Sequence, residues 1–168
     1  MKQLLFSLLT IIAISACGQG DKSKRPSPPA IVTETISSGT IVSIDYSQPS
    51  LKGRKVGTEL APYGQVWRTG ANEATVFEVS KDVKVEGQPL AAGKYGLYSI
   101  PGESEWTIIF SKTWKTWGTQ YKEADDALRV KVSSAKTETI SEKLTFFIDK
   151  SGKVSLSWGD TVVAFNVQ

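Results

Sequence analysis

The strongest constraint on the fold of this sequence is an alternation of apolar and polar residues that begins near Ile31. In the segment LRVKV, residues 128–132, apolar residues alternate with Arg129 and Lys131. Successive side chains of a β-strand point to opposite faces of the sheet, so this pattern is typical of a strand that is buried on one face. No long segment follows the 3.6-residue period of an amphipathic helix. The chain is therefore constrained to fold mainly from strands.

The same alternation recurs along the chain and is interrupted by turn signals. It is present in residues 40–47, 73–79, 94–100, 105–111, 144–148, 154–158 and 162–167. Glycine-containing turn pairs stand at Gly87-Gln88, Ala92-Gly93, Pro101-Gly102 and Ser151-Gly152. Short strands with turns about every 8–12 residues are typical of a β-sandwich or barrel. The sequence predicts an all-β fold, an antiparallel β-sandwich of about nine or ten strands. Jelly-roll and immunoglobulin-like arrangements are both open.

The first residues read as an export signal. A positive end at Met1-Lys2 precedes an apolar run from Leu4 to Ile14. The run is shorter than the ~20 residues that span a bilayer, and it suits the apolar region of a signal peptide. It ends in Ile14-Ser15-Ala16-Cys17, which resembles the bacterial lipobox. We expect residues 1–16 to be removed and Cys17 to carry acyl chains such as palmitate; an ordinary cleaved signal with an incidental cysteine is the alternative.

The residues after Cys17 predict a tether and a location. Residues 17–30 hold glycine, serine and three prolines but no large apolar side chain, so we expect a lipidated cysteine followed by a flexible spacer. Residues 31–168 then form a single β-sandwich domain. Gly18, and not an acidic residue, follows the cysteine, which by resemblance to the usual sorting rule favours the outer membrane. Asp21 is a weak sign of surface export, so the membrane face stays open.

Composition excludes several kinds of chemistry. The sequence has no histidine and one cysteine, which removes serine–histidine–acid triads and histidine or thiolate metal sites. The densest acidic stretch, Glu123 to Asp126, lacks the spacing of a calcium-binding loop, so we predict no metal site and no cofactor. The net charge of +3 is spread along the chain, which argues against a nucleic-acid partner. A carboxylate-based glycan hydrolase is the remaining enzymatic alternative, although no residue can be assigned a catalytic role.

Two stretches break the strand pattern, residues 49–72 and 112–126. Long irregular segments are uncommon in a small β-domain, and loops held by a rigid scaffold often carry binding residues. We therefore place the candidate site residues in or beside these two stretches.

The first stretch ends in WRTGANEAT, residues 67–75. A turn at Gly70 or Asn72 brings Arg68 and Glu73 towards the same end of the sheet. A guanidinium matches a carboxylate in a bidentate pair, so the favoured interpretation is an ion pair that fixes the loop, shielded by Trp67. The alternative is a ligand-binding corner made by Arg68, Asn72 and Glu73, extended by Arg54.

The second stretch carries aromatic residues at a regular spacing. Trp114, Trp117 and Tyr121 are three and four positions apart, so they would form one stripe on a short helical turn. The stripe either closes an end of the sandwich or offers flat rings on which a sugar or an aromatic ligand can stack.

Five blocks of the sequence resemble a known family. They are DYSQPSLKGRKV (45–56), LAPYGQVWRTGANEAT (60–75), LAAGKYGLYSIPGESEWTIIF (90–110), WGTQY (117–121) and DALRVKV (126–132). Together they are similar to a domain of unknown function that is common in secreted proteins and lipoproteins of Bacteroidota and related bacteria. The block P-Y-G-x-V-W-R-T-G-A-N-E-A-T carries most of the resemblance, which covers residues 28–167. It implies an exported location and this domain extent, and it implies no activity or catalytic residue.

These observations lead to one functional hypothesis with two alternatives. We expect a lipid-anchored envelope protein, in the outer membrane, that is not an enzyme and binds a glycan, a small molecule or an envelope protein. The candidate binding residues are Arg54, Trp67, Arg68, Asn72, Glu73, Trp114, Trp117 and Tyr121. The alternatives are a purely structural component of an envelope assembly and the carboxylate-based hydrolase.

Overall fold

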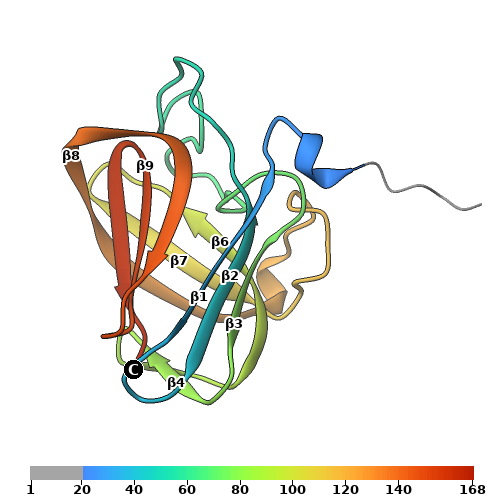
Figure 1. Ribbon diagram of the computed structural model, residues 1–168, viewed down its shortest axis with the longest axis vertical. Helices are drawn as coiled ribbons and strands as arrows, with labels where there is room; N and C mark the ends of the chain where they lie inside the picture. Colours follow the sequence, from blue (N-terminus) through green and yellow to red (C-terminus); the bar gives the residue numbers. More distant parts are fainter. Residues whose placement is uncertain (1–20) are drawn as a thin grey trace, which may run out of the picture.

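The computed structural model describes residues 21–168, so the predicted signal peptide and Cys17 lie outside the described residues. Strands make up most of this part of the chain (Figure 1). They are β1 (Pro29–Thr35), β2 (Ile41–Ser47), β3 (Thr75–Val79), β4 (Val83–Val85), β5 (Gln88–Leu90), β6 (Gly93–Ile100), β7 (Glu105–Ser111), β8 (Asp126–Ile148) and β9 (Lys153–Asn166). Two short 3-10 helices, η1 (Lys22–Lys24) and η2 (Glu123–Asp125), complete the elements.

All strand pairs are antiparallel, and seven strands form one sheet in the order β1-β2-β3-β6-β7-β8-β9. The remaining two, β4 and β5, form a hairpin inserted between β3 and β6. The predicted all-β antiparallel class is confirmed. Neighbours in the sheet follow one another along the chain apart from this insertion, so the order is that of a meander and not the Greek-key order of jelly-roll or immunoglobulin domains.

The long strand β8 connects two layers of the molecule. Its first residues, 126–133, pair with β7, whereas residues 134–148 pair with β9. The register shifts between Lys136 and Thr145, where the strand bends (Figure 1). The β8–β9 hairpin thereby lies over the inner face of the sheet and encloses the core.

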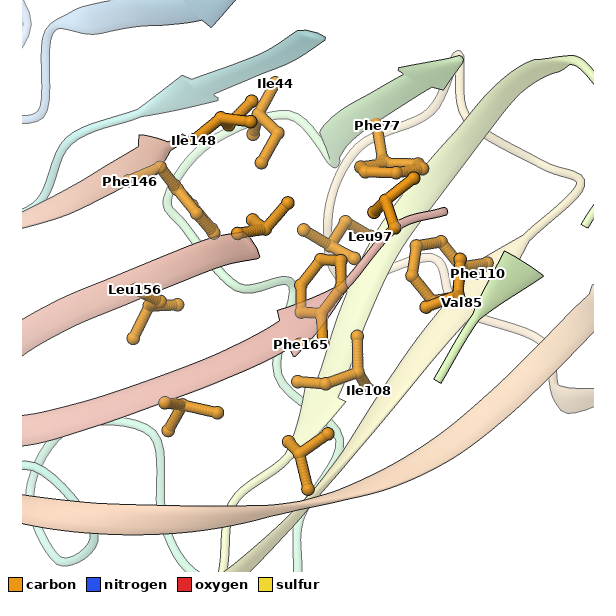
Figure 2. Close-up of a cluster of buried hydrophobic side chains, with 14 of the residues drawn as sticks. Ile44, Phe77, Val85, Leu97, Ile108, Phe110, Phe146, Ile148, Leu156 and Phe165 are labelled. Carbon is orange, nitrogen blue, oxygen red and sulfur yellow. The ribbon is translucent and has the colours of Figure 1, made fainter. Parts of the chain in front are cut away.

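The core forms where the inner faces of these layers meet. Phe165 of β9 lies 6.0 Å from Phe77 and 5.8 Å from Phe110, measured between ring centroids. Figure 2 shows this cluster, in which Leu97 of β6 and Ile108 of β7 lie on the same face of the sheet as Phe110. The alternation in residues 128–132 is confirmed: its apolar side chains are buried or half-buried, and its two basic side chains are exposed. Burial of these apolar faces is the main stabilising contribution to the fold.

The outer face of the sheet is also covered in one place. Tyr98 and Ile109 point outward from β6 and β7, yet both are fully buried, because residues 112–122 cross over them. The ring of Tyr121 packs 4.9 Å from that of Tyr98. Gly96 permits this crossing, since a Cβ there would approach the carbonyl oxygen of Thr113 to 2.7 Å. The covering segment forms one wall of the site described next.

Candidate ligand-binding pocket

A pocket with a volume of about 410 Å³ opens on the outer face of the sheet. Its floor includes Asp45 of β2 and Val76 of β3, which are register partners. One wall is the segment Trp114 to Trp117, and the opposite wall holds Lys22 and Arg25 from the N-terminal segment. The other lining residues are Pro29, Tyr46, Ser47, Glu73 and Ala74. In Figure 1, η1 and the pale-orange segment that follows β7 lie on the same side of the sheet.

The loop that carries WRTGANEAT is rigid because buried hydrogen bonds fix it. The backbone of Trp67 exchanges two hydrogen bonds with Ser99 of β6, both 2.8 Å long. The hydroxyl of Thr69 donates to Ser99 Oγ at 3.0 Å, and the hydroxyl of Thr75 donates to the carbonyl oxygen of Thr69 at 3.0 Å. These bonds hold Thr69 at φ 48°, a left-handed conformation that β-branched residues rarely adopt. The loop therefore presents the next residues in a fixed position.

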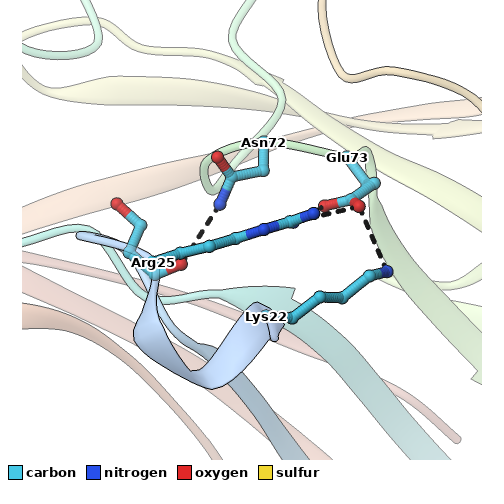
Figure 3. Close-up of polar contacts among 5 residues, drawn as sticks. Lys22, Arg25, Asn72 and Glu73 are labelled. Atoms are coloured by element: carbon cyan, nitrogen blue, oxygen red, sulfur yellow. Dashed lines mark hydrogen bonds and ion pairs between the residues drawn. The ribbon is translucent and has the colours of Figure 1, made fainter. Parts of the chain in front are cut away.

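Glu73 lies at the rim of the pocket and pairs with the N-terminal segment (Figure 3). Arg25 Nη1 donates to its two carboxylate oxygens at 3.0 and 2.8 Å, and Lys22 Nζ lies 3.1 Å from Oε1. Beside this pair, Asn72 at φ 62° donates from Nδ2 to the carbonyl oxygen of Ser27 at 3.1 Å. The predicted pairing of Glu73 with Arg68 is wrong.

This result also corrects the expectation for the tether. Residues 21–30 were expected to be a flexible spacer, but in the structure they form η1, contact Glu73 and enter β1 at Pro29. The cause is the antiparallel pairing of β1 with β2, which sets Pro29 opposite Ser47. The residues just before Pro29 therefore lie at the same end of the sheet as Glu73, which precedes β3. Composition alone could not show these contacts, because the partners are 48 positions apart.

The surroundings of Glu73 keep it ionised. Burial raises the pKa of this carboxyl group, but hydrogen bonds from its own backbone N–H, from Arg25 and from Lys22 outweigh that effect and lower the pKa from 4.5 to about 2. Hydrogen bonds to a carboxylate favour its charged form. Glu73 is therefore an anion with its partners in place at neutral pH.

Arg68 occupies a different position. Its side chain passes beneath Gly118, where an added Cβ would collide with it. Within residues 21–168 it makes no hydrogen bond and no ion pair, and its Nε is buried without a partner. The positive charge of Arg68 opposes the effect of burial, which raises the pKa of Tyr98. The side chain thus supports the covering segment 112–122 from below.

Three further candidates do not reach the pocket. Arg54 donates to the carbonyl oxygens of Leu51 and Ser50 and lies beside a separate hollow. Trp67 belongs to the core: its ring stacks on Trp158 at 5.3 Å. Tyr121 donates to Asp126 at 2.7 Å and accepts from Arg129 at 2.7 Å. Burial raises the pKa of Tyr121 to about 12, together with the Asp126 hydrogen bond.

The pocket does bring together Glu73, Trp114 and Trp117. The segment that carries the tryptophans is not helical, so the single stripe expected from their spacing does not form. Instead, a backbone bridge joins Glu73 to Trp117, and Ala74 N–H donates to the carbonyl oxygen of Thr116 at 3.1 Å. Trp117 remains 48% exposed at the pocket, while Lys94 Nζ lies 5.3 Å from the ring centroid of Trp114.

Sequence reasoning missed the carboxylate on the pocket floor. The side chain of Asp45 makes no hydrogen bond or ion pair with any residue that the structure describes. Burial raises its pKa, and the charge of Glu73 adds to this, while Lys22 and Lys94 oppose it. The alternation of residues 40–47 already indicated that Asp45 faces away from the core, but only the fold shows what stands above it. Lys22, Arg25 and Lys115 were missed for the same reason.

A family model described as "Protein of unknown function (DUF2911)" matches residues 27–167. The chain belongs to this family. The DUF2911 match includes every strand and both tryptophans of the pocket, whereas Lys22 and Arg25 precede it. The resemblance to a domain of unknown function is thus confirmed at the level of the family. No curated protein and no solved structure matches the chain.

Residues 21–168 of this DUF2911 chain contain no helix that is long and apolar enough to cross a membrane. They also contain no group of three or more acidic, histidine or cysteine side chains placed to hold a metal ion.

Proposed function

We propose that this protein is a lipid-anchored, non-enzymatic binding protein of the bacterial envelope, and that its ligand enters the pocket beside Trp117. One observation carries the proposal: the exposed ring of Trp117 and the carboxylate of Asp45, which has no partner in residues 21–168, line the same preformed pocket. The volume of about 410 Å³ lies within the range of roughly 300–1,000 Å³ that small-molecule sites occupy.

The state of the carboxylates favours binding over hydrolysis. Glycoside hydrolysis by carboxylates generally requires one acid that is protonated and a second that acts as base or nucleophile. Of the two carboxylates that line the pocket, Glu73 has its pKa lowered to about 2, so it does not supply a proton at neutral pH, and its oxygens are held by Arg25 and Lys22, which makes it a poor base or nucleophile. Asp45 is then left without a partner for this reaction.

The fixed geometry of the loops also supports a binding role. Hydrogen bonds and backbone bridges tie residues 72–74 to residues 116–118, so the wall and the rim of the pocket move as one unit. A site that is rigid before the ligand arrives loses less conformational freedom on binding. A structural role in an assembly would require no pocket of this kind.

Lipid anchoring rests on the lipobox-like Ile14-Ser15-Ala16-Cys17. Lys22 of the pocket wall lies five positions after Cys17, which limits its distance from the anchor to about 17 Å in an extended chain. The proposal therefore places the ligand site close to the membrane surface.

The anchor is tested by a Cys17→Ser variant expressed in the native host. We expect the variant to leave the membrane fraction and to lose incorporation of labelled palmitate. A variant that stays in the membrane fraction would contradict lipid anchoring at this residue.

The binding role is tested by screening the full-length protein, purified in detergent, against glycans and metabolites. Trp117→Ala should abolish the binding of any true ligand, whereas Phe147→Ala should leave it unchanged. Phe147 is the matched control because it is an exposed aromatic residue, 62% accessible, that does not line the pocket. If ligands bind equally well to both variants, the pocket is not the site.

A further inference from the structure

The charges around the pocket limit what its ligand can be. The lining residues hold three cations, Lys22, Arg25 and Lys115, and two anions, Asp45 and Glu73. Lys22 and Arg25 share the single carboxylate of Glu73, so within residues 21–168 the charged lining side chains left without an ion-pair partner are Lys115 and Asp45. An anionic ligand would face Asp45, and a cationic ligand would face Lys115. Unpartnered charges of both signs line the same pocket, so a ligand that carries either charge meets a like charge, whereas an uncharged ligand does not.

The aromatic rings add a second requirement. Trp117 offers an exposed indole face in the wall, and the adjacent Trp114 extends this apolar surface. A flat ring provides a large apolar contact with little loss of side-chain freedom. The ligand must therefore have one apolar face, and that face must be uncharged.

Asp45 supplies a third requirement. An ionised carboxylate only accepts hydrogen bonds, and its two oxygens offer about four acceptor positions. In the structure these positions are unused by any residue in 21–168, and the side chain is exposed at the pocket, where a ligand can reach it. A carboxylate with several free acceptor positions is best satisfied by a ligand that brings several donors at once.

We infer that the pocket binds an uncharged saccharide, with one pyranose ring stacked on Trp117 and ring hydroxyls donating to Asp45. A pyranose meets all three requirements, because its C–H groups form an apolar face and its hydroxyls surround the rim. This inference rests on the proposed binding function and specifies its ligand. It also gives the free Lys115 a role, since an ammonium can donate to the remaining hydroxyl oxygens.

Isothermal titration of the full-length protein in detergent tests the inference with three groups of oligosaccharides. The groups are neutral glucose, mannose and N-acetylglucosamine oligomers, cationic glucosamine oligomers, and anionic uronic acid oligomers. We expect the neutral group to bind, with less than a roughly twofold change in affinity between low and moderate salt, because no net charge is neutralised.

The variants locate the binding. Trp117→Ala and Asp45→Asn should each weaken the neutral ligand by roughly tenfold or more. Phe147→Ala and Glu138→Gln are the matched controls, since both lie at exposed positions outside the pocket, and they should bind as the unmodified protein does. Unchanged thermal unfolding shows that each variant is folded.

The outcomes separate this inference from the broader proposal. If only the cationic or only the anionic oligomers bind, or if Asp45→Asn has no effect, the uncharged-saccharide inference is overturned. If no oligosaccharide binds but a metabolite from the wider screen does, and that binding requires Trp117, the saccharide inference fails while the binding function stands. If nothing binds in either experiment, both fail.

Discussion

The two long irregular segments of the chain both interrupt the strand pattern and both carry tryptophan, but one packs into the core and the other lines the pocket. Residues 49–72 carry Trp67, which stacks in the core against Trp158, and the backbone of this segment is tied to β6. Residues 112–122 carry Trp117, which lies on the outer face and is 48% exposed. The difference teaches that an aromatic residue in a loop is informative about binding only when the fold leaves its ring open. We call residues 49–72 the core loop and residues 112–122 the wall loop.

The largest expected effect separates the two tryptophans. Trp67→Ala removes a ring that contacts both Trp106 and Trp158, and large-to-small changes of this type cost about 3–5 kcal/mol in the free energy of unfolding. Trp117→Ala removes an exposed ring and should change that free energy by less than ~0.5 kcal/mol. Urea unfolding followed by circular dichroism measures both. Equal losses of stability in the two variants would contradict the assignment of Trp67 to the core and of Trp117 to the exposed wall.

The next effect tests how Arg68 supports the wall loop. In Gly118→Ala the new methyl group collides with the Arg68 side chain and approaches the carbonyl oxygen of Asn72, so we expect a loss of about 1–3 kcal/mol in the free energy of unfolding. In the double variant Arg68→Ala/Gly118→Ala, the side-chain collision is removed. The double variant should therefore be more stable than additivity of the two single variants predicts. Strict additivity would show that the two side chains do not interact.

A smaller effect concerns the N-terminal segment that forms the second wall. Arg25→Ala removes the two contacts of Nη1 with the Glu73 carboxylate, and because this pair is partly exposed to water we expect a cost of only ~0.5–1 kcal/mol, confined to the segment. Limited proteolysis within residues 21–28 should become faster. Lys24→Ala is the matched control, since it removes the same charge from a side chain that is 83% exposed. Faster cleavage in both variants would mean that the Glu73 contact does not hold the segment.

The smallest effect is a pH dependence of the same contact. The pKa of Glu73 is lowered from 4.5 to about 2 in the folded state, so its pairing stabilises the docked segment fully above pH 4.5 and is lost as the pH falls towards 2. Hydrogen exchange of residues 21–28, corrected for its intrinsic pH dependence, should show protection that declines in this window. Arg25→Ala should weaken that decline. Protection that stays constant from pH 5 to pH 2 in the unmodified protein would contradict the role of Glu73.

Part of the candidate site could be found in the sequence, and part could not. Trp114, Trp117 and Glu73 were found because aromatic spacing and a charged loop are local features. Asp45 was overlooked because an outward-facing acidic residue in a strand normally contacts water. Lys22 and Arg25 were overlooked because their composition indicated a spacer, and no local feature shows that they contact Glu73, which lies 48 positions after Arg25.

The sequence by itself determined most of the strands and the faces they bury, because these depend on a period of two in neighbouring residues. Only the tertiary structure decided which loop enters the core, which partner Glu73 takes, and that a meander of strands carries a pocket on its outer face. The physical reason is that these features arise from the pairing of distant strands. The pairing of β1 with β2 and the crossing of the wall loop over Gly96 bring together side chains whose proximity no local pattern records.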